Sequence, residues 1–214
     1  MKEIRYTLVS EGSSDRVLLP ILNWLLRQHT AGYAIQAEWA ELRHLPRPPR
    51  EFAAKIRMSL DLYPCDVLFV HRDADKVAYH TRVTEIQRAL SQVDVWDIER
   101  SIPVIPVRMT EAWLLLDEAA LRHAAGNPNG RQQLEIPPLN RLEQLPDSKQ
   151  ILHQLLKDAS ELSGRHLKRF PVEASVWRIT QFIHDFALLR ALEAFQNLEQ
   201  NVRQVVSAQG WASH

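Results

Sequence analysis

Three carboxylates in two short segments have the residue types and the spacing to bind a divalent cation. Glu11 lies in the first segment. Asp73 and Asp75 flank a single residue in the second, so in an extended segment both are expected to point the same way. Two neighbouring carboxylates repel each other unless a cation lies between them. Hard oxygen ligands select Mg²⁺ or Mn²⁺ rather than zinc, and such an ion keeps coordination positions open for phosphate and water. These residues therefore predict a metal site suited to phosphodiester hydrolysis, since the ion activates water and neutralises charge.

Strand and helix patterns alternate around these segments. Residues 4–9 form a short β-rich run just before Glu11. A strand is also expected at 66–70, where the apolar residues 67–70 indicate burial on both faces. A third strand is expected at 102–107. Extended structure is also expected within 33–45, and helical periods are found at about 13–29, 50–62, 76–92 and 110–121. This order predicts an α/β fold of the Rossmann-like kind, with a mostly parallel sheet and flanking helices.

The pattern changes after residue 125. The segment 126–147 holds four prolines and two glycines, and it is predicted to be a linker. Helical periods follow at about 148–162 and 172–208. We therefore expect an α/β domain at 1–125, a linker at 126–147 and a helical C-terminal extension at 148–214.

A fourth carboxylate follows the third expected strand. Ligands of parallel α/β sheets bind beyond the carboxyl ends of the strands. Glu11, the Asp73–Asp75 pair and Glu111 all follow strands, so we expect them at one rim of the sheet, with Glu111 as a further metal ligand. The two glutamates also have a plain structural explanation, because Glu11 and Glu111 suit the start of a helix.

Two of these segments resemble a known family. Residues 9–15 (VSEGSSD) and 69–75 (FVHRDAD) resemble the Toprim domain of topoisomerases, primases and several nucleases. In that family a glutamate after the first strand acts in acid–base chemistry or metal binding, and an Asp-x-Asp after a later strand binds Mg²⁺. The resemblance implies these roles for Glu11, Asp73 and Asp75.

A closer resemblance covers most of the chain. Residues 106–115 (PVRMTEAWLL), 146–149 (PDSK) and 165–170 (RHLKRF) are similar to a bacterial family of Toprim-like proteins of unknown function, whose genes often lie beside an ATPase gene in predicted phage-defence loci. The OLD nucleases also carry a Toprim domain. Similarity to them and to this bacterial family implies a Mg²⁺-dependent endonuclease on DNA or RNA with an ATPase partner. The chain lacks the zinc-binding cysteines of primases and the size of a topoisomerase, which excludes those activities.

Three further residues lie beside the acidic motifs. Arg72 and Arg108 are suited to hold a phosphate or to stabilise transition-state charge, and a salt bridge to the same carboxylates is the alternative. His71 is either a ligand or general base, or a histidine that is simply hydrogen-bonded at the end of a buried strand.

Bulk charge does not point to nucleic acid. The 214 residues include 26 basic and 26 acidic side chains, so attraction to a polyanion must come from a local patch. Arg165, Lys168 and Arg169 form the best local candidate for phosphate contact, and a solvated loop is the alternative.

The single cysteine, Cys65, excludes an internal disulfide and fits a reducing cytoplasm. No signal-peptide pattern follows the N-terminus, and the longest apolar stretch, 17–26, is too short to span a bilayer, so no membrane association is expected. Two other function classes stay open. One is a non-catalytic interaction or regulatory subunit that docks on an ATPase through the apolar helices after residue 148, and the other is a small nucleotide-binding module. A homo-oligomer is compatible with the same helices.

Overall fold

The sheet of this protein contains four parallel strands in the order β2-β1-β3-β4. The structure is a computed structural model that describes residues 2–212. The strands span Lys2–Val9 (β1), Tyr33–Trp39 (β2), Val67–His71 (β3) and Ser101–Val104 (β4). The helices that alternate with them are Leu18–His29 (α1), Phe52–Leu62 (α2) and Tyr79–Leu90 (α3). The expected α/β fold with a parallel sheet is confirmed.

The burial of a strand follows its position in the sheet. Every residue of β3 is buried, whereas β2 at the sheet edge is half-buried. Leu8 pairs with Phe69 and Val9 pairs with Val70. This register brings β1 and β3 to the same edge of the sheet, so the residues that follow them start side by side.

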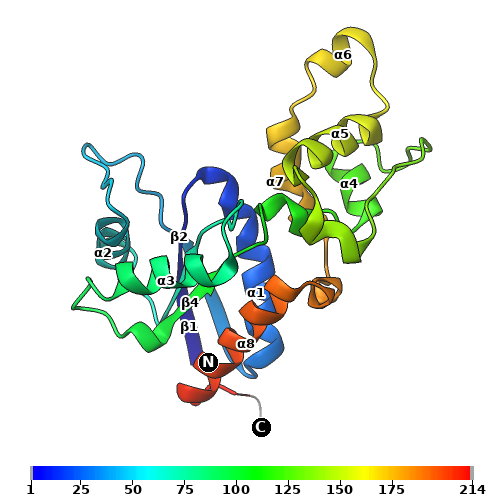
Figure 1. Ribbon diagram of the computed structural model, residues 1–214. Coiled ribbons are helices and arrows are strands. Elements are labelled where there is room, and N and C mark those ends of the chain that lie inside the picture. Colours follow the sequence, from blue (N-terminus) through cyan, green and yellow to red (C-terminus); the bar gives the residue numbers. More distant parts are fainter. Residues whose placement is uncertain (1, 213–214) are drawn as a thin grey trace. The chain divides into compact units, whose positions relative to one another are not determined.

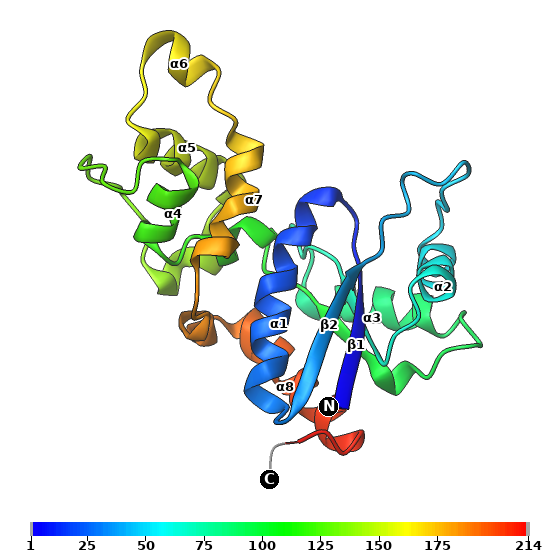
Figure 2. The same cartoon turned by 180° about the vertical axis from the view of Figure 1, so that it is seen from behind.

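Helices cover both faces of the sheet (Figures 1 and 2). On one face Tyr6 packs edge-on against Phe69, with 5.1 Å between ring centroids, and its hydroxyl donates to the Leu19 carbonyl of α1. On the other face Val70 belongs to a core cluster that includes Ile56 of α2. Consecutive strand residues thus bury opposite faces under different helices.

The chain divides into two compact units. The sheet unit holds the residues up to 105 together with those from 197 onward, and the helical unit holds residues 106–196. The segment 126–147 therefore lies within the helical unit, although the sequence suggested a linker there. The C-terminal helix α8 (Glu193–Ala208) brings the chain back to the sheet unit, where His29 of α1 lies 2.8 Å from Glu199.

The helical unit packs around aromatic residues. Trp113 is fully buried and lies edge-on to Phe195, with 5.5 Å between ring centroids. Its helices span Glu118–Ala124 (α4), Ser148–Ser160 (α5), Gly164–Lys168 (α6) and Val172–Phe182 (α7). No helix among residues 2–212 has the length and apolarity to cross a bilayer.

Two expected helices are interrupted. The helix expected at 172–208 stops at Phe182 and resumes at Glu193, and the Asp185 side chain accepts from the Ala187 amide between them. The helix expected at 110–121 is a 3-10 turn followed by α4, whose start is capped by the Asp117 side chain. In both places a short acidic side chain competes for backbone amides and starts a new element.

Candidate functional site

The carboxyl ends of β1 and β3 form the centre of the candidate site. These strands are neighbours, and the helices that follow the first two strands lie on opposite faces of the sheet. The chain steps to β2 on one side of β1 and to β3 on the other, so the strand order reverses between β1 and β3. A crevice beyond strands at such a reversal is the usual ligand site of open α/β sheets.

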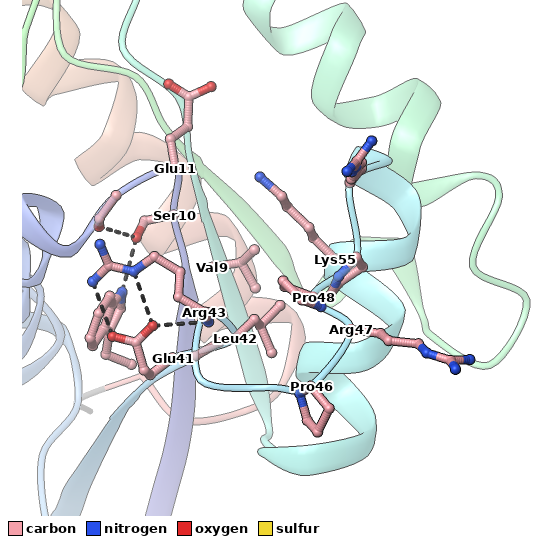
Figure 3. Close-up of a pocket in the computed structure, with 15 residues that line it drawn as sticks. Val9, Ser10, Glu11, Glu41, Leu42, Arg43, Pro46, Arg47, Pro48 and Lys55 are labelled. Carbon is pink, nitrogen blue, oxygen red and sulfur yellow. Dashed lines mark hydrogen bonds and ion pairs between the residues drawn. The ribbon is translucent and has the colours of Figure 1, made fainter.

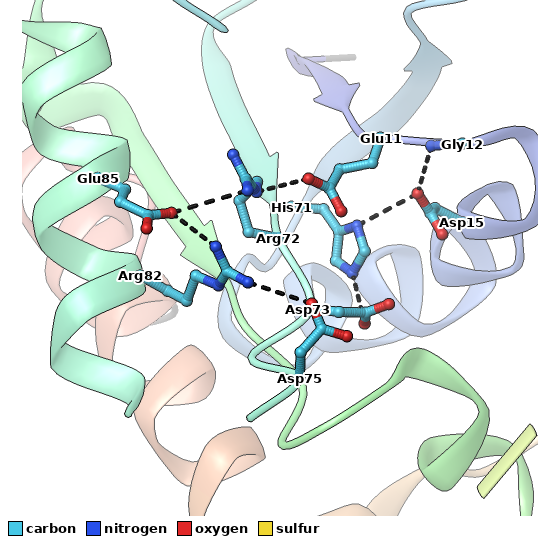
Figure 4. A network of polar contacts seen from close by, with 9 residues as sticks. All are labelled: Glu11, Gly12, Asp15, His71, Arg72, Asp73, Asp75, Arg82 and Glu85. Carbon is cyan, nitrogen blue, oxygen red and sulfur yellow. Dashed lines mark hydrogen bonds and ion pairs between the residues drawn. The ribbon is translucent and has the colours of Figure 1, made fainter. Parts of the chain in front are cut away.

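A chain of alternating charges crosses this edge (Figure 4). Oε1 of Glu11 lies 2.7 Å from Nε of Arg72, whose guanidinium also lies 3.7 Å from Glu85. Arg82 then bridges Glu85 at 2.8 Å and Asp75 at 3.1 Å. The salt-bridge alternative considered for Arg72 is therefore present in the structure, and each of these carboxylates has a cationic partner.

A second network lies deeper, around His71. Its Nδ1 lies 3.4 Å from Oδ2 of Asp15, and its Nε2 lies 3.3 Å from Oδ1 of Asp73. Burial alone would lower the pKa of His71, but the two carboxylates outweigh burial and raise its pKa to about 9. Burial acts against ionisation of Asp15 as well, yet the bonds from His71 and from the Gly12 amide hold the pKa of Asp15 below its usual value. The imidazole is therefore a buried cation held between two anions.

Exposure separates the two networks. The side chains of Glu11 and Asp75 are 47% and 55% exposed, whereas that of His71 is 1% exposed. Asp73 lies between these extremes at 19%. An ion arriving from solvent would thus meet Glu11 and Asp75 first, while the buried His71 contacts Asp73 from the protein interior.

The Asp-x-Asp segment is not extended. Asp75 adopts a left-handed conformation with φ 53°, and the Val77 amide donates to the Ala74 carbonyl in the turn that follows. The sequence-based expectation that both aspartates point the same way along an extended segment is therefore wrong. Asp73 turns to His71 and Asp75 turns to Arg82.

The three predicted ligands have the chemistry that a hard cation prefers. Glu11, Asp73 and Asp75 supply carboxylate oxygens from adjacent strand ends, and Mg²⁺ prefers such ligands. Within residues 2–212 no three acidic, histidine or cysteine side chains converge closely enough to hold an ion. Binding would require Glu11 and Asp75 to exchange their arginine partners for the metal. Metal binding stays a prediction.

The other predicted residues belong to the helical unit. Glu111 is buried in the 3-10 turn Thr110–Leu114, and Arg108 has a left-handed φ of 63°. Arg165 and Lys168 lie in α6 and Arg169 follows it, all three exposed. Their roles in metal or phosphate binding stay predictions.

A pocket of about 720 Å³ opens beside Glu11 and was not anticipated from the sequence (Figure 3). One wall comes from residues 9–12, at the end of β1 and just after it. Another comes from residues 39–43 and 46–50, at the end of β2 and in the loop that follows. Lys55 of α2 completes the lining. The signal that sequence reasoning overlooked is the run of residues 46–50 (PRPPR), where arginines alternate with prolines between a strand and a helix.

Comparison with known proteins adds no relative: no family model, curated protein or solved structure matches the chain.

Proposed function

We propose that this protein is a Mg²⁺-dependent, Toprim-like nuclease that hydrolyses phosphodiesters in DNA or RNA. The observation that carries the proposal is the position of Glu11 and the Asp73–Asp75 pair directly after two neighbouring parallel strands. Carboxylates at such a strand reversal are suited to a cation that contacts phosphate. We extend the proposal to a cytoplasmic role in bacterial phage defence together with an ATPase, on the basis of the sequence resemblance.

Each residue has a distinct proposed role. Glu11, Asp73 and Asp75 would hold the ion, which when bound activates water and neutralises charge on the phosphate. Arg72, released from Glu11, would contact a phosphate oxygen through its guanidinium. His71 would orient Asp73 rather than bind metal, because both of its ring nitrogens face carboxylates.

Cleavage assays with matched variants test this proposal. Glu11→Gln and Asp73→Asn remove one negative charge each while keeping side-chain size, and both should abolish Mg²⁺-dependent cleavage of plasmid DNA and of RNA. Asp61→Asn is the control, since Asp61 is an exposed carboxylate of α2 away from the strand ends. Full cleavage activity in both site variants, with folding verified by circular dichroism, would rule the nuclease out.

A second candidate function is a non-catalytic interaction subunit. It is favoured by the pairing of Glu11 with Arg72 and of Asp75 with Arg82, which is also what a purely structural network requires. Calorimetry distinguishes the two: absence of Mg²⁺ and Mn²⁺ binding, together with co-purification with an ATPase encoded beside the gene, would support the interaction subunit. Metal binding that disappears in Glu11→Gln would support the nuclease.

A further inference from the structure

We propose that the pocket beside Glu11 binds the phosphate groups of a single-stranded nucleic acid. This inference rests on the proposed nuclease function and assigns its substrate class. It concerns a different set of residues, on the loop that joins β2 to α2. We call residues 43–50 the basic loop.

Charge in the pocket is not balanced. Arg43 is paired with Glu41, to which its Nε and Nη2 both lie at 3.2 Å. In contrast, Arg50 and Lys55 line the pocket without an ion pair to any of the residues 2–212. Lys55 is half-buried, and in Figure 3 its side chain extends from α2 toward the side of the pocket formed by β1. Unpaired cations at a concave surface favour an anionic ligand.

The walls of the pocket are held in place before any ligand binds. Pro46, Pro48 and Pro49 fix the backbone φ angle at three positions of the basic loop. The two walls are joined where the indole of Trp39 donates to the Ser10 hydroxyl at 2.9 Å, and that hydroxyl donates to the Gly12 carbonyl at 3.1 Å. A site that is ordered in advance loses less entropy on binding.

Size argues for a single strand. A pocket of about 720 Å³ is in the range that encloses one small molecule, so about one or two nucleotides of a flexible strand fit, whereas a duplex does not enter. Glu11 lies on the wall of this pocket and also in the ion network at the strand ends. A strand held by Lys55 and Arg50 would therefore pass a phosphate beside the proposed metal ligands.

The test measures binding in EDTA, where metal-dependent cleavage cannot occur. A fluorescein-labelled ten-residue oligothymidylate is titrated with wild type and with the double variant Arg50→Glu/Lys55→Glu, and fluorescence anisotropy is followed at several salt concentrations. We expect the Kd to rise at least about tenfold and the salt dependence, as log Kd against log salt, to fall by about 1.4, since two phosphate contacts are lost. Arg88→Glu, an exposed arginine of α3 outside the pocket, should leave the Kd within about twofold.

Three results would overturn the inference: no binding of the oligonucleotide to wild type, an unchanged Kd in the double variant, or equal competition by a ten-base-pair duplex or by an oligoglutamate peptide. Because charge reversal can disturb folding, the neutral variant Arg50→Gln/Lys55→Gln is measured too and should show a smaller rise in Kd. Binding lost in both double variants without any cleavage by wild type would leave the pocket site in place and remove the nuclease. If the wild type cleaves and the double variants keep both cleavage and binding unchanged, the nuclease function stands and the pocket site is ruled out.

Discussion

The Nδ1 atom of His71 lies 3.4 Å from Oδ2 of Asp15, although the two residues are 56 positions apart in the sequence and both are buried. Asp73 faces the other ring nitrogen at 3.3 Å. The loop after β1 and the loop after β3 are thus joined through one protonated imidazole. Since Asp73 is a proposed metal ligand, this pair connects the stability of the fold to the geometry of the candidate site.

The first prediction concerns the dependence of stability on pH. The pKa of His71 is raised from 6.5 to about 9 in the folded protein, so folding is favoured by the proton. This stabilisation is fully present below pH 6.5 and is lost as the pH rises through 9, a change on the order of 3 kcal/mol in the free energy of unfolding. Urea unfolding in EDTA between pH 6 and pH 9.5 measures it.

Asp15→Asn should reduce this loss of stability at high pH, because His71 then has one anionic neighbour instead of two. It should also lower stability near pH 6.5 by about 1 to 3 kcal/mol, since the buried imidazole loses one of its two carboxylate partners. Asp61→Asn, an exposed change of the same kind, should keep the full pH dependence. A wild-type free energy of unfolding that stays flat from pH 6.5 to pH 9.5 would contradict a charged His71.

The second prediction follows from the left-handed backbone of Asp75. An alanine at φ 53° is strained, whereas glycine adopts that conformation freely. We expect Asp75→Gly to be more stable than Asp75→Ala by about 1 kcal/mol, measured by thermal or urea unfolding. The ion pair with Arg82 contributes little to this difference, because both variants lack it and Asp75 is 55% exposed. Equal stability of the two variants would argue against the turn at Asp75.

The same pair of variants separates function from folding. Both remove a proposed metal ligand, so both should lose Mg²⁺-dependent cleavage to the same extent despite their different stabilities. If Asp75→Gly cleaves normally while Asp75→Ala does not, Asp75 serves the fold rather than the metal.

Sequence patterns were sufficient for the sheet but not for the networks around its edge. The strands at 4–9 and 66–70 were predictable because an apolar run between turn residues has few alternatives, and their parallel order followed from the intervening helices. Glu85 and Arg82 lie on α3 and reach the site through tertiary packing alone. Nothing in the local sequence indicates which carboxylate an arginine will contact, so these partners could not be predicted.

Local backbone chemistry explains the remaining differences. The extended Asp-x-Asp was expected because the alternation of aspartates fits a strand, but the segment turns after Ala74, which only the tertiary structure reveals. The basic loop was overlooked for a different reason. The sequence predicted extended structure only as far as residue 45, although the arginines between the prolines that follow carried the information about a charged pocket.

The third prediction concerns the exposed cations of the helical unit. Arg165 and Lys168 are exposed on α6 and are candidates for phosphate contact. If they bind single-stranded nucleic acid, the double variant Arg165→Ala/Lys168→Ala should reduce the salt dependence of binding by about 1.4. Arg88→Ala should leave it unchanged. An unchanged salt dependence in the α6 variant would support the solvated-loop alternative and leave the pocket as the main basic site.

The fourth prediction tests competition between Arg72 and a metal ion for Glu11. The 2.7 Å ion pair between them must open before Glu11 can bind Mg²⁺. Replacing the guanidinium in Arg72→Gln removes a positive charge from the site, and at surface dielectric this is worth about 1 kcal/mol or more, so Mg²⁺ or Mn²⁺ should bind about tenfold more tightly.

Cleavage should move in the opposite direction, because the same variant lacks the proposed phosphate contact. Calorimetry or electron paramagnetic resonance of bound Mn²⁺ gives the affinity, and a plasmid or oligonucleotide assay gives the rate. Arg88→Gln controls for the change in net charge and should alter neither quantity. Weaker metal binding in Arg72→Gln would mean that Arg72 orients Glu11 for the ion instead of competing with it. Tighter binding together with slower cleavage requires Arg72 to have two successive partners, Glu11 in the free protein and the phosphate during reaction.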